Sequence, residues 1–198
     1  MLDRTSTLFY KTAASPLVAL VPRILAHLRQ GGVIAYATES CFGLGCDPRN
    51  YRAVKRILEI KGRPQKKGLI LIASELELLS PYLAPLTPAE LTQLNQNWPG
   101  PTTVLVPANS HAPNWLTGRH KTIAVRVTAH TDSARLCHAL KMALVSTSAN
   151  RSGQIPFKRF QQCVQGLGNK VMVLPGRIGK RKRPSTILDL KSGKIFRK

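Results

Sequence analysis

The chain has very few acidic residues. Its 198 residues include only 9 Asp and Glu against 30 Lys and Arg, which gives a formal net charge of +21. This imbalance exceeds what solubility requires, and it predicts attraction to nucleotides, phosphates, RNA or an acidic membrane surface. Aromatic residues make up only 6% of the chain. Their scarcity disfavours a binder of single-stranded nucleic acid that stacks bases on aromatic rings.

Metal-binding and redox motifs are also missing. The four cysteines (Cys41, Cys46, Cys137 and Cys163) include no pair at two-residue spacing, and the five histidines are scattered. We therefore expect no protein-bound metal and a reducing compartment. We expect Cys41 to be a buried apolar residue rather than a reactive thiol.

Long apolar runs are absent as well. The most signal-like stretch, residues 13–21, is short, contains Pro16 and lies between Lys11 and Arg23. It predicts neither a signal peptide nor a membrane span, so we expect a cytoplasmic protein without a membrane partner. The chain also lacks a Walker loop, and Gly43 and Gly45 lack the third glycine of a dinucleotide fingerprint. Side chains would therefore have to hold any bound phosphates.

Apolar residues make up 43% of the chain, enough for a core, and helical and strand patterns alternate without repeats or linkers. We expect one α/β domain over residues 1–198, with residues 1–14 as a loose arm. Several connections look too short for parallel crossovers, so a twisted, mixed sheet flanked by helices is expected. The predicted strands are 33–37, 69–73, 102–107, 122–127, 142–145, 171–174, 185–190 and 194–196. The predicted helices are 17–29, 47–60, 75–82, 88–97, 131–141 and 157–167. Residues 43–45, 108–121 and 176–184 are predicted to be loops.

Two stretches far apart in sequence together predict one anion site. Residues 145–156 follow a strand and are rich in hydroxyl, amide and glycine residues, which let a ligand approach the backbone. Lys61 and Arg63 follow a helix end and, in an extended segment, would point to the same side. Alone, the first stretch could be a polar turn and the second a solvated charge run. Together they could form the two walls of a phosphate-binding cleft.

Six motifs in order resemble those of the YrdC family, and the length resembles its short bacterial branch. The motifs are Ala35–Ser40 with Gly43–Asp47, Lys61–Pro64, Trp98–Thr102, Ala124–Val127, Ser148–Gly153 and Ser185–Thr186. The likeness extends from about residue 15 to the end. It departs from the family at Ala37, where proline is usual, and at Ser40, where threonine is common. The second domain of longer members is missing, so a more open pocket is expected.

The resemblance implies threonylcarbamoyl-AMP synthesis, a nucleotidyl transfer. Family members join L-threonine, bicarbonate and ATP and release pyrophosphate. The product serves the modification of adenosine 37 in tRNAs that read codons beginning with A. Mg²⁺ is expected to arrive with ATP, and threonylcarbamoyl-transferase proteins are the expected downstream partners.

The resemblance also implies roles for individual residues. The expected catalytic residues are Lys61, Arg63, Ser148 and Asn150. The expected ATP-binding residues are Arg63, Lys67, Thr122, Ser148 and Arg197. The expected threonine-binding residues are Thr38, Ser40, Arg126, Ser146 and Ser185, with Arg126 receiving the carboxylate.

One alternative remains open, a non-catalytic module that binds double-stranded RNA or tRNA. The net charge supports it directly, since a basic concave surface can hold duplex RNA through phosphate contacts. Such a module needs neither the polar loop at 148–150 nor Arg126, so those residues separate the two hypotheses.

Overall fold

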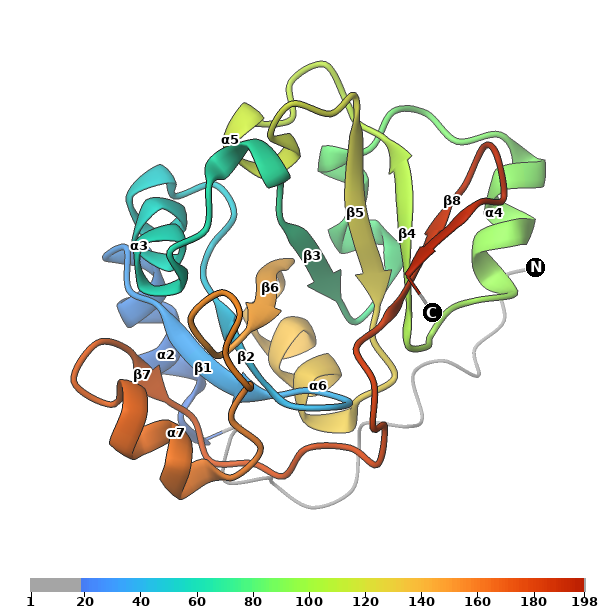
Figure 1. Cartoon of the computed structure of the whole chain (residues 1–198). Helices are drawn as coiled ribbons and strands as arrows, with labels where there is room; N and C mark the ends of the chain where they lie inside the picture. Colours follow the sequence, from blue (N-terminus) through green and yellow to red (C-terminus); the bar gives the residue numbers. More distant parts are fainter. Residues whose placement is uncertain (1–18, 198) are drawn as a thin grey trace.

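One mixed sheet of nine strands forms the centre of the structure, a computed structural model that describes residues 19–197 (Figure 1). The strands are β1 (Ile34–Ala37), β2 (Phe42–Gly45), β3 (Ile70–Ala73), β4 (Thr102–Pro107), β5 (Thr122–Val127), β6 (Leu144–Ser148), β7 (Met172–Val173), β8 (Thr186–Asp189) and β9 (Ile195–Arg197). Their order across the sheet is β7-β1-β2-β6-β3-β5-β4-β8-β9. The pairs β1–β7, β3–β5 and β4–β8 are parallel and the others are antiparallel. The predicted α/β fold with a mixed sheet is confirmed.

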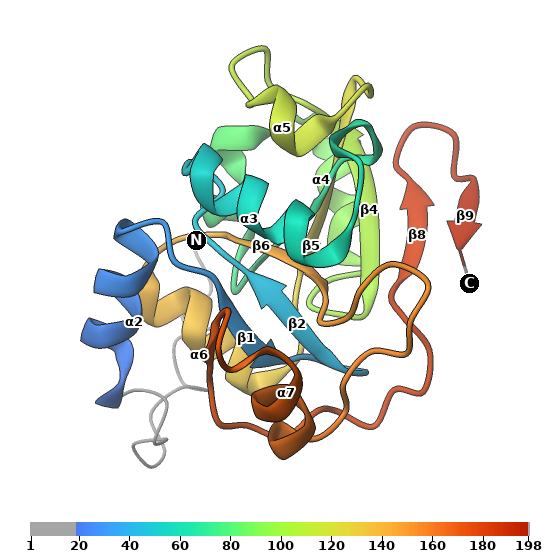
Figure 2. The same ribbon diagram turned by 60° about the vertical axis from the view of Figure 1, so that its left-hand side comes forward.

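Helices cover both sides of this sheet. They are α2 (Val21–Arg29), α3 (Tyr51–Lys61), α4 (Pro88–Asn95), α5 (Asn114–Thr117), α6 (Thr131–Leu140) and α7 (Phe160–Leu167), with short 3₁₀ turns η2 (Gln65–Lys67), η3 (Leu76–Leu78) and η4 (Ser80–Tyr82). Apolar residues of α2 and α6 pack on Ile34, Ile72 and Leu144 in one cluster. The larger cluster lies on the opposite face and includes α3 and α4. Figure 2 shows α2 beside α6, and the β8–β9 hairpin at the far end of the sheet.

The strand register places a polar floor beside the α2–α6 contact. In β5, Ile123, Val125 and Val127 are buried in the larger core, so the alternating residues Thr122, Ala124 and Arg126 face the other way. Arg126 is the cross-strand partner of Ile72, and Ile70 is paired with both Ala124 and Ser146. Directly paired residues share a face of a sheet. The face that α6 covers at Ile72 therefore continues into a floor that carries Arg126 and Ser146.

For three segments, the predicted type of secondary structure was wrong. Residues 43–45 form the buried strand β2, where a Cβ on Gly45 would lie 2.7 Å from Tyr36 Cε1. Glycine therefore serves close packing here rather than flexibility. Residues 75–82 form η3 and η4 instead of a helix, since Pro81 disfavours helical backbone at Ser80. The predicted loop 108–121 contains α5.

Some predicted boundaries also differ. The strand predicted at 142–145 is β6, which runs on to Ser148. The helix predicted from residue 157 begins at Phe160, and the helix predicted from residue 47 begins at Tyr51, after the capping side chain of Asn50. Residues 1–14, the predicted arm, lie outside the described residues. Within residues 19–197, no helix has both the length and the apolar character to cross a bilayer.

Candidate active site

A cleft of about 950 Å³ opens over the polar floor of the sheet. All twelve residues predicted from the sequence for the site line it: Thr38, Ser40, Lys61, Arg63, Lys67, Thr122, Arg126, Ser146, Ser148, Asn150, Ser185 and Arg197. They come from the β1–β2 turn, the end of α3 with the η2 turn that follows it, the strand β5, the strand β6 with the loop after it, the residue before β8, and the C-terminal β9. The structure therefore brings the cationic and the hydroxyl-rich stretches into one cleft.

Lys61 joins the two walls of the cleft. It ends α3, is 4% exposed, and its Nζ donates to the backbone oxygen of Ser148. The same nitrogen lies 3.0 Å from the Asn150 backbone oxygen and 3.2 Å from its Oδ1. The backbone N–H of Ser152 returns a bond to the Lys61 oxygen at 2.8 Å. Lys61 thus fixes the conformation of the loop that follows β6.

The surroundings of Lys61 disfavour its charged form. Burial, and secondarily the Arg63 guanidinium, lower the pKa of the Lys61 ammonium to about 8. Arg63 itself donates to the Gly68 oxygen from Nη2 at 3.0 Å. Gly62, between the two, has a left-handed backbone with φ 57°. The segment is therefore not extended, contrary to the expectation from the sequence. Both side chains reach the cleft because the helix ends in a turn.

A second group of polar residues lies at the C-terminal hairpin. Arg197 on β9 donates to the Ser185 oxygen at 2.8 Å and to Ser185 Oγ at 2.9 Å. Thr103 on β4 donates to the same Oγ at 2.9 Å. Burial, and secondarily the nearby guanidinium groups of Arg126, Arg63 and Arg181, lower the pKa of Arg197. Four arginines therefore contribute to the field of one cleft, where anions are attracted.

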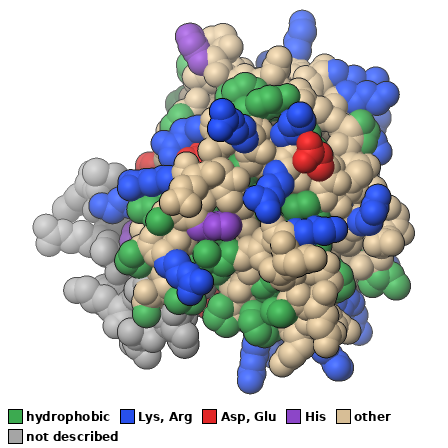
Figure 3. Space-filling model, turned by 90° about the vertical axis from the view of Figure 1, so that its left-hand side faces the viewer, with side chains coloured by type: hydrophobic (Ala, Val, Ile, Leu, Met, Phe, Trp, Pro, Cys, Tyr) green, Lys and Arg blue, Asp and Glu red, His purple; other side chains and the backbone are tan. Residues whose placement is uncertain are grey.

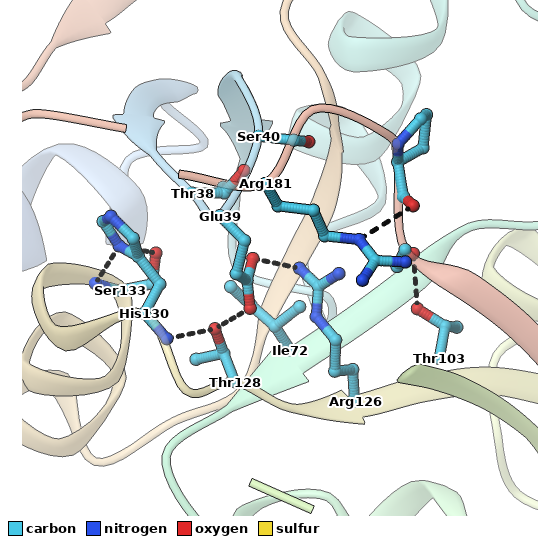
Figure 4. Close-up of polar contacts among 12 residues, drawn as sticks. Thr38, Glu39, Ser40, Ile72, Thr103, Arg126, Thr128, His130, Ser133 and Arg181 are labelled. Atoms are coloured by element: carbon cyan, nitrogen blue, oxygen red, sulfur yellow. Dashed lines mark hydrogen bonds and ion pairs between the residues drawn. The ribbon is translucent and has the colours of Figure 1, made fainter. Parts of the chain in front are cut away.

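Arg126 lies on the floor and forms an ion pair with Glu39 in the β1–β2 turn (Figure 4). Arg126 Nη2 is 3.2 Å from Glu39 Oε2, and both side chains are largely buried. Arg126 Nε is buried without a hydrogen-bond partner. Buried donors are normally paired, so an orphan donor in a cleft is a natural contact for a ligand oxygen. Glu39 was not predicted from the sequence as a site residue.

Small polar residues form the end of the cleft near the β1–β2 turn. Thr38 closes this turn, since its Oγ1 and its N–H both bond the Cys41 oxygen. A Cβ on Gly43 would lie 3.2 Å from Thr38 Cγ2 and 3.7 Å from Ser146 Oγ. Cys41 is buried as expected, and burial raises the pKa of its thiol. These residues leave space for a small polar ligand.

The basic loop at 176–184, which we call the strap, also borders the cleft. Its Gly179 N–H donates to the Thr38 oxygen at 2.9 Å, and its Arg181 N–H donates to the Glu39 oxygen at 3.1 Å. Lys182 and Pro184 line the cleft. Residues 176–184 were predicted from the sequence only as a loop, without a place in the site.

Other lining residues were missed as well: Thr117, His120, Lys158, Lys182 and Asp189. A period-two pattern across β8, with Ser185, Ile187 and Asp189 on one face, could have identified Asp189. The remaining residues lie mainly in loops, whose course the sequence pattern does not give.

The described residues form no metal site, and neither tryptophan lines the cleft. Within residues 19–197, no three His, Cys, Asp or Glu side chains cluster in a way that could hold a metal ion. Trp98 is 8% exposed and donates to the Thr102 oxygen, so it serves packing. Trp115 donates to the Pro48 oxygen and contacts the Tyr51 ring.

Comparison with known proteins finds a matching family model and similar proteins over most of the chain. The model of the family described as telomere recombination (Sua5, YciO and YrdC) matches residues 26–198. The threonylcarbamoyl-AMP synthase of Methylobacillus flagellatus is 56% identical over 176 residues, 88% of this chain and 98% of its own. That of Chromobacterium violaceum is 53% identical over 178 residues, 90% of this chain and 92% of its own.

Solved structures agree in fold. Escherichia coli YciO superposes with a TM-score of 0.81 at 25% identity, over 93% of this chain and 91% of its own. The Pyrococcus abyssi Sua5 complex with L-threonine superposes with a TM-score of 0.82 at 27% identity. That match covers 90% of this chain and 53% of Sua5, which is longer.

Proposed function

The chain belongs to the Sua5/YciO/YrdC family and has threonylcarbamoyl-AMP synthase activity, a nucleotidyl transfer that serves tRNA modification; on this premise we propose how the cleft performs it. Arg126 binds the threonine carboxylate, and Thr38, Ser40, Ser146 and Ser185 surround the rest of the amino acid. Arg63, Lys67, Thr122, Ser148 and Arg197 bind ATP. Lys61 and Asn150 shape the wall between the two substrates.

The observation that carries this assignment is the contact of Lys61 with Ser148 and Asn150 at one side of a floor that presents Arg126. N-carboxylated threonine attacks the α-phosphorus of ATP, its carbamate oxygen bonds to phosphorus, and pyrophosphate leaves. Negative charge builds on the phosphoryl oxygens and the leaving group, where fixed cations stabilise it. Arg63 and Arg197 supply such charge without proton transfer, because guanidinium groups stay protonated.

Mg²⁺ fits this scheme as a companion of ATP. Asp189 is the only carboxylate among the described residues that line the cleft, too few for a cage of protein ligands. The ATP phosphates and water would hold the ion, which therefore enters as part of the substrate.

The test is pyrophosphate release from ATP, measured with and without L-threonine and bicarbonate. We expect release to require both. Arg126→Ala should raise the KM for threonine and leave the KM for ATP near its original value, whereas Arg63→Ala should do the reverse. Exposed Arg29→Ala on α2 is the control for a lost guanidinium. Equal effects of the first two variants on both substrates would refute the division of the cleft.

RNA binding is proposed as an accompanying property, because the charge is general rather than confined to the cleft. Figure 3 shows Lys and Arg side chains spread over the face on the left of Figure 1, with few acidic ones. The non-catalytic alternative does not fit the activity of the close relatives. Binding of tRNA or double-stranded RNA should weaken steeply with salt, as phosphate contacts do.

A further inference from the structure

Glu39 is held at both carboxylate oxygens. Oε2 pairs with Arg126 Nη2, and Oε1 accepts a 2.7 Å hydrogen bond from Thr128 Oγ1. Its backbone oxygen accepts from the Arg181 N–H of the strap. Thr128 Oγ1 accepts in turn from the His130 N–H at 3.2 Å, which connects the group to the start of α6 (Figure 4). Glu39 is therefore fixed from two elements and cannot reorient freely.

Arg126 needs such a partner. Its side chain is 8% exposed, and a buried guanidinium without a counterion is costly. Within the described residues, Glu39 is its only ion-pair partner at salt-bridge distance. The nearby guanidinium group of Arg197 would repel an unpaired Arg126 from its place on the floor.

We propose that Glu39 is a positioning residue for the reaction: its carboxylate holds Arg126 so that the free side of the guanidinium faces the threonine site. The inference rests on the proposed role of Arg126 as the receiver of the threonine carboxylate. Because Glu39 takes one Nη2 hydrogen, the unpaired Nε–H remains for the substrate. An arginine held in advance loses less conformational entropy on binding than a mobile one.

A role for Glu39 as general base fits the contacts less well. Its two oxygens are already occupied by a cation and a hydroxyl donor, so neither is free to take a proton from the substrate. The two roles predict different kinetics. A lost base lowers kcat and changes its pH profile, whereas a misplaced Arg126 raises the KM for threonine.

A double-mutant cycle tests the proposal on the full chain, with pyrophosphate release as the assay. Glu39→Ala should raise the KM for threonine by roughly 10- to 100-fold, as small misplacements of a binding group do. The KM for ATP and the pH profile of kcat should change little. Glu39→Gln should recover part of the loss, because its amide oxygen still accepts from Arg126 although the counter-charge is gone. Thr128→Ala should reproduce part of the loss.

The decisive variant is Glu39→Ala combined with Arg126→Ala, which should match Arg126→Ala alone because Glu39 acts only through Arg126. Glu59→Ala is the control, since Glu59 pairs with Lys55 on the exposed side of α3. If Arg126→Ala leaves the threonine KM unchanged, the proposed role of Arg126 fails. If it raises that KM but Glu39→Ala does not, or the double variant loses further, the positioning role fails. Should Glu39→Ala not fold, Glu39→Gln and Thr128→Ala complete the test with the same readouts.

Discussion

Lys61 and Asn150 are 89 residues apart in sequence, yet the Lys61 ammonium contacts both oxygens of Asn150, at 3.0 Å and 3.2 Å. With the Ser148 oxygens, the ammonium has more acceptors around it than it has protons to donate. Lys61 is thus a cross-link between the two walls as well as a cation in the cleft. This double position makes it the most informative residue to change.

Lys61→Ala should lower turnover by roughly 100-fold or more, because it removes a fixed cation and releases the loop after β6. Affinity for RNA should hardly change, since one charge among thirty Lys and Arg contributes little to a diffuse field. Steady-state pyrophosphate release and RNA filter binding measure the two effects. Exposed Lys55→Ala on the same helix is the control. Equal losses in both assays would instead support the RNA-binding module.

ATP binding should be accompanied by proton uptake near pH 8. In the free protein, burial and Arg63 lower the pKa of Lys61 to about 8, so about half of these groups are neutral there. The phosphates favour the ammonium and raise this pKa, so each binding event takes up about half a proton at pH 8 and almost none at pH 6. Calorimetry of ATP binding without threonine, in buffers of different ionisation enthalpy, measures the uptake.

The matched variant for this measurement is Lys61→Arg, whose guanidinium stays charged throughout the range. It should bind ATP without the uptake at pH 8. Proton release in the original protein, or the same uptake in both proteins, would contradict the assignment to Lys61.

The strap should depend on the absence of a side chain at Gly179. A Cβ there would lie 2.8 Å from the Glu39 backbone oxygen and 3.1 Å from the Glu39 Cα. These are backbone atoms, which cannot move aside as the end of a flexible side chain can. Gly179→Ala should therefore destabilise the protein by about 1–3 kcal/mol, as overpacking does, and raise the KM for threonine through Glu39. Urea unfolding and threonine kinetics measure the two effects. Exposed Lys180→Ala in the same strap removes a charge without the clash and should leave both near the original values.

Residue patterns sufficed for much of the fold. Residues 122–127, predicted as a strand, form β5 with the same bounds, and the apolar run before Ser74 predicted β3. The pattern failed at residues 43–45, where glycines usually indicate a loop. Here they allow β2 to approach Tyr36, a packing constraint that the local sequence does not show.

Site residues could be predicted from the sequence where residue type and chemistry coincide, as for Lys61, Arg63 and Ser148. They could not be predicted where function depends on contacts between elements. Glu39 is one of few acidic residues, but only the fold brings it to Arg126 on β5. Lys182 and His120 belong to loops, so no periodicity indicates that they line the cleft.

Arg197 should bind ATP from the last strand of the chain. Its guanidinium is fixed by two bonds to Ser185, and the neighbouring arginines lower its pKa in addition to burial, so an arriving polyphosphate relieves their repulsion. Arg197→Ala should raise the KM for ATP by roughly tenfold, the size expected for one charge-assisted hydrogen bond of about 1.5 kcal/mol. The KM for threonine should change much less, because Thr103 still holds Ser185. Arg197→Lys should reverse only part of the rise in the ATP KM, because an ammonium cannot reproduce the two-donor contact with Ser185. Lys191→Ala removes a charge from the turn of the same hairpin and should leave both constants unchanged. A rise in the ATP KM for Lys191→Ala as large as that for Arg197→Ala would show that the general field, not this contact, binds the nucleotide.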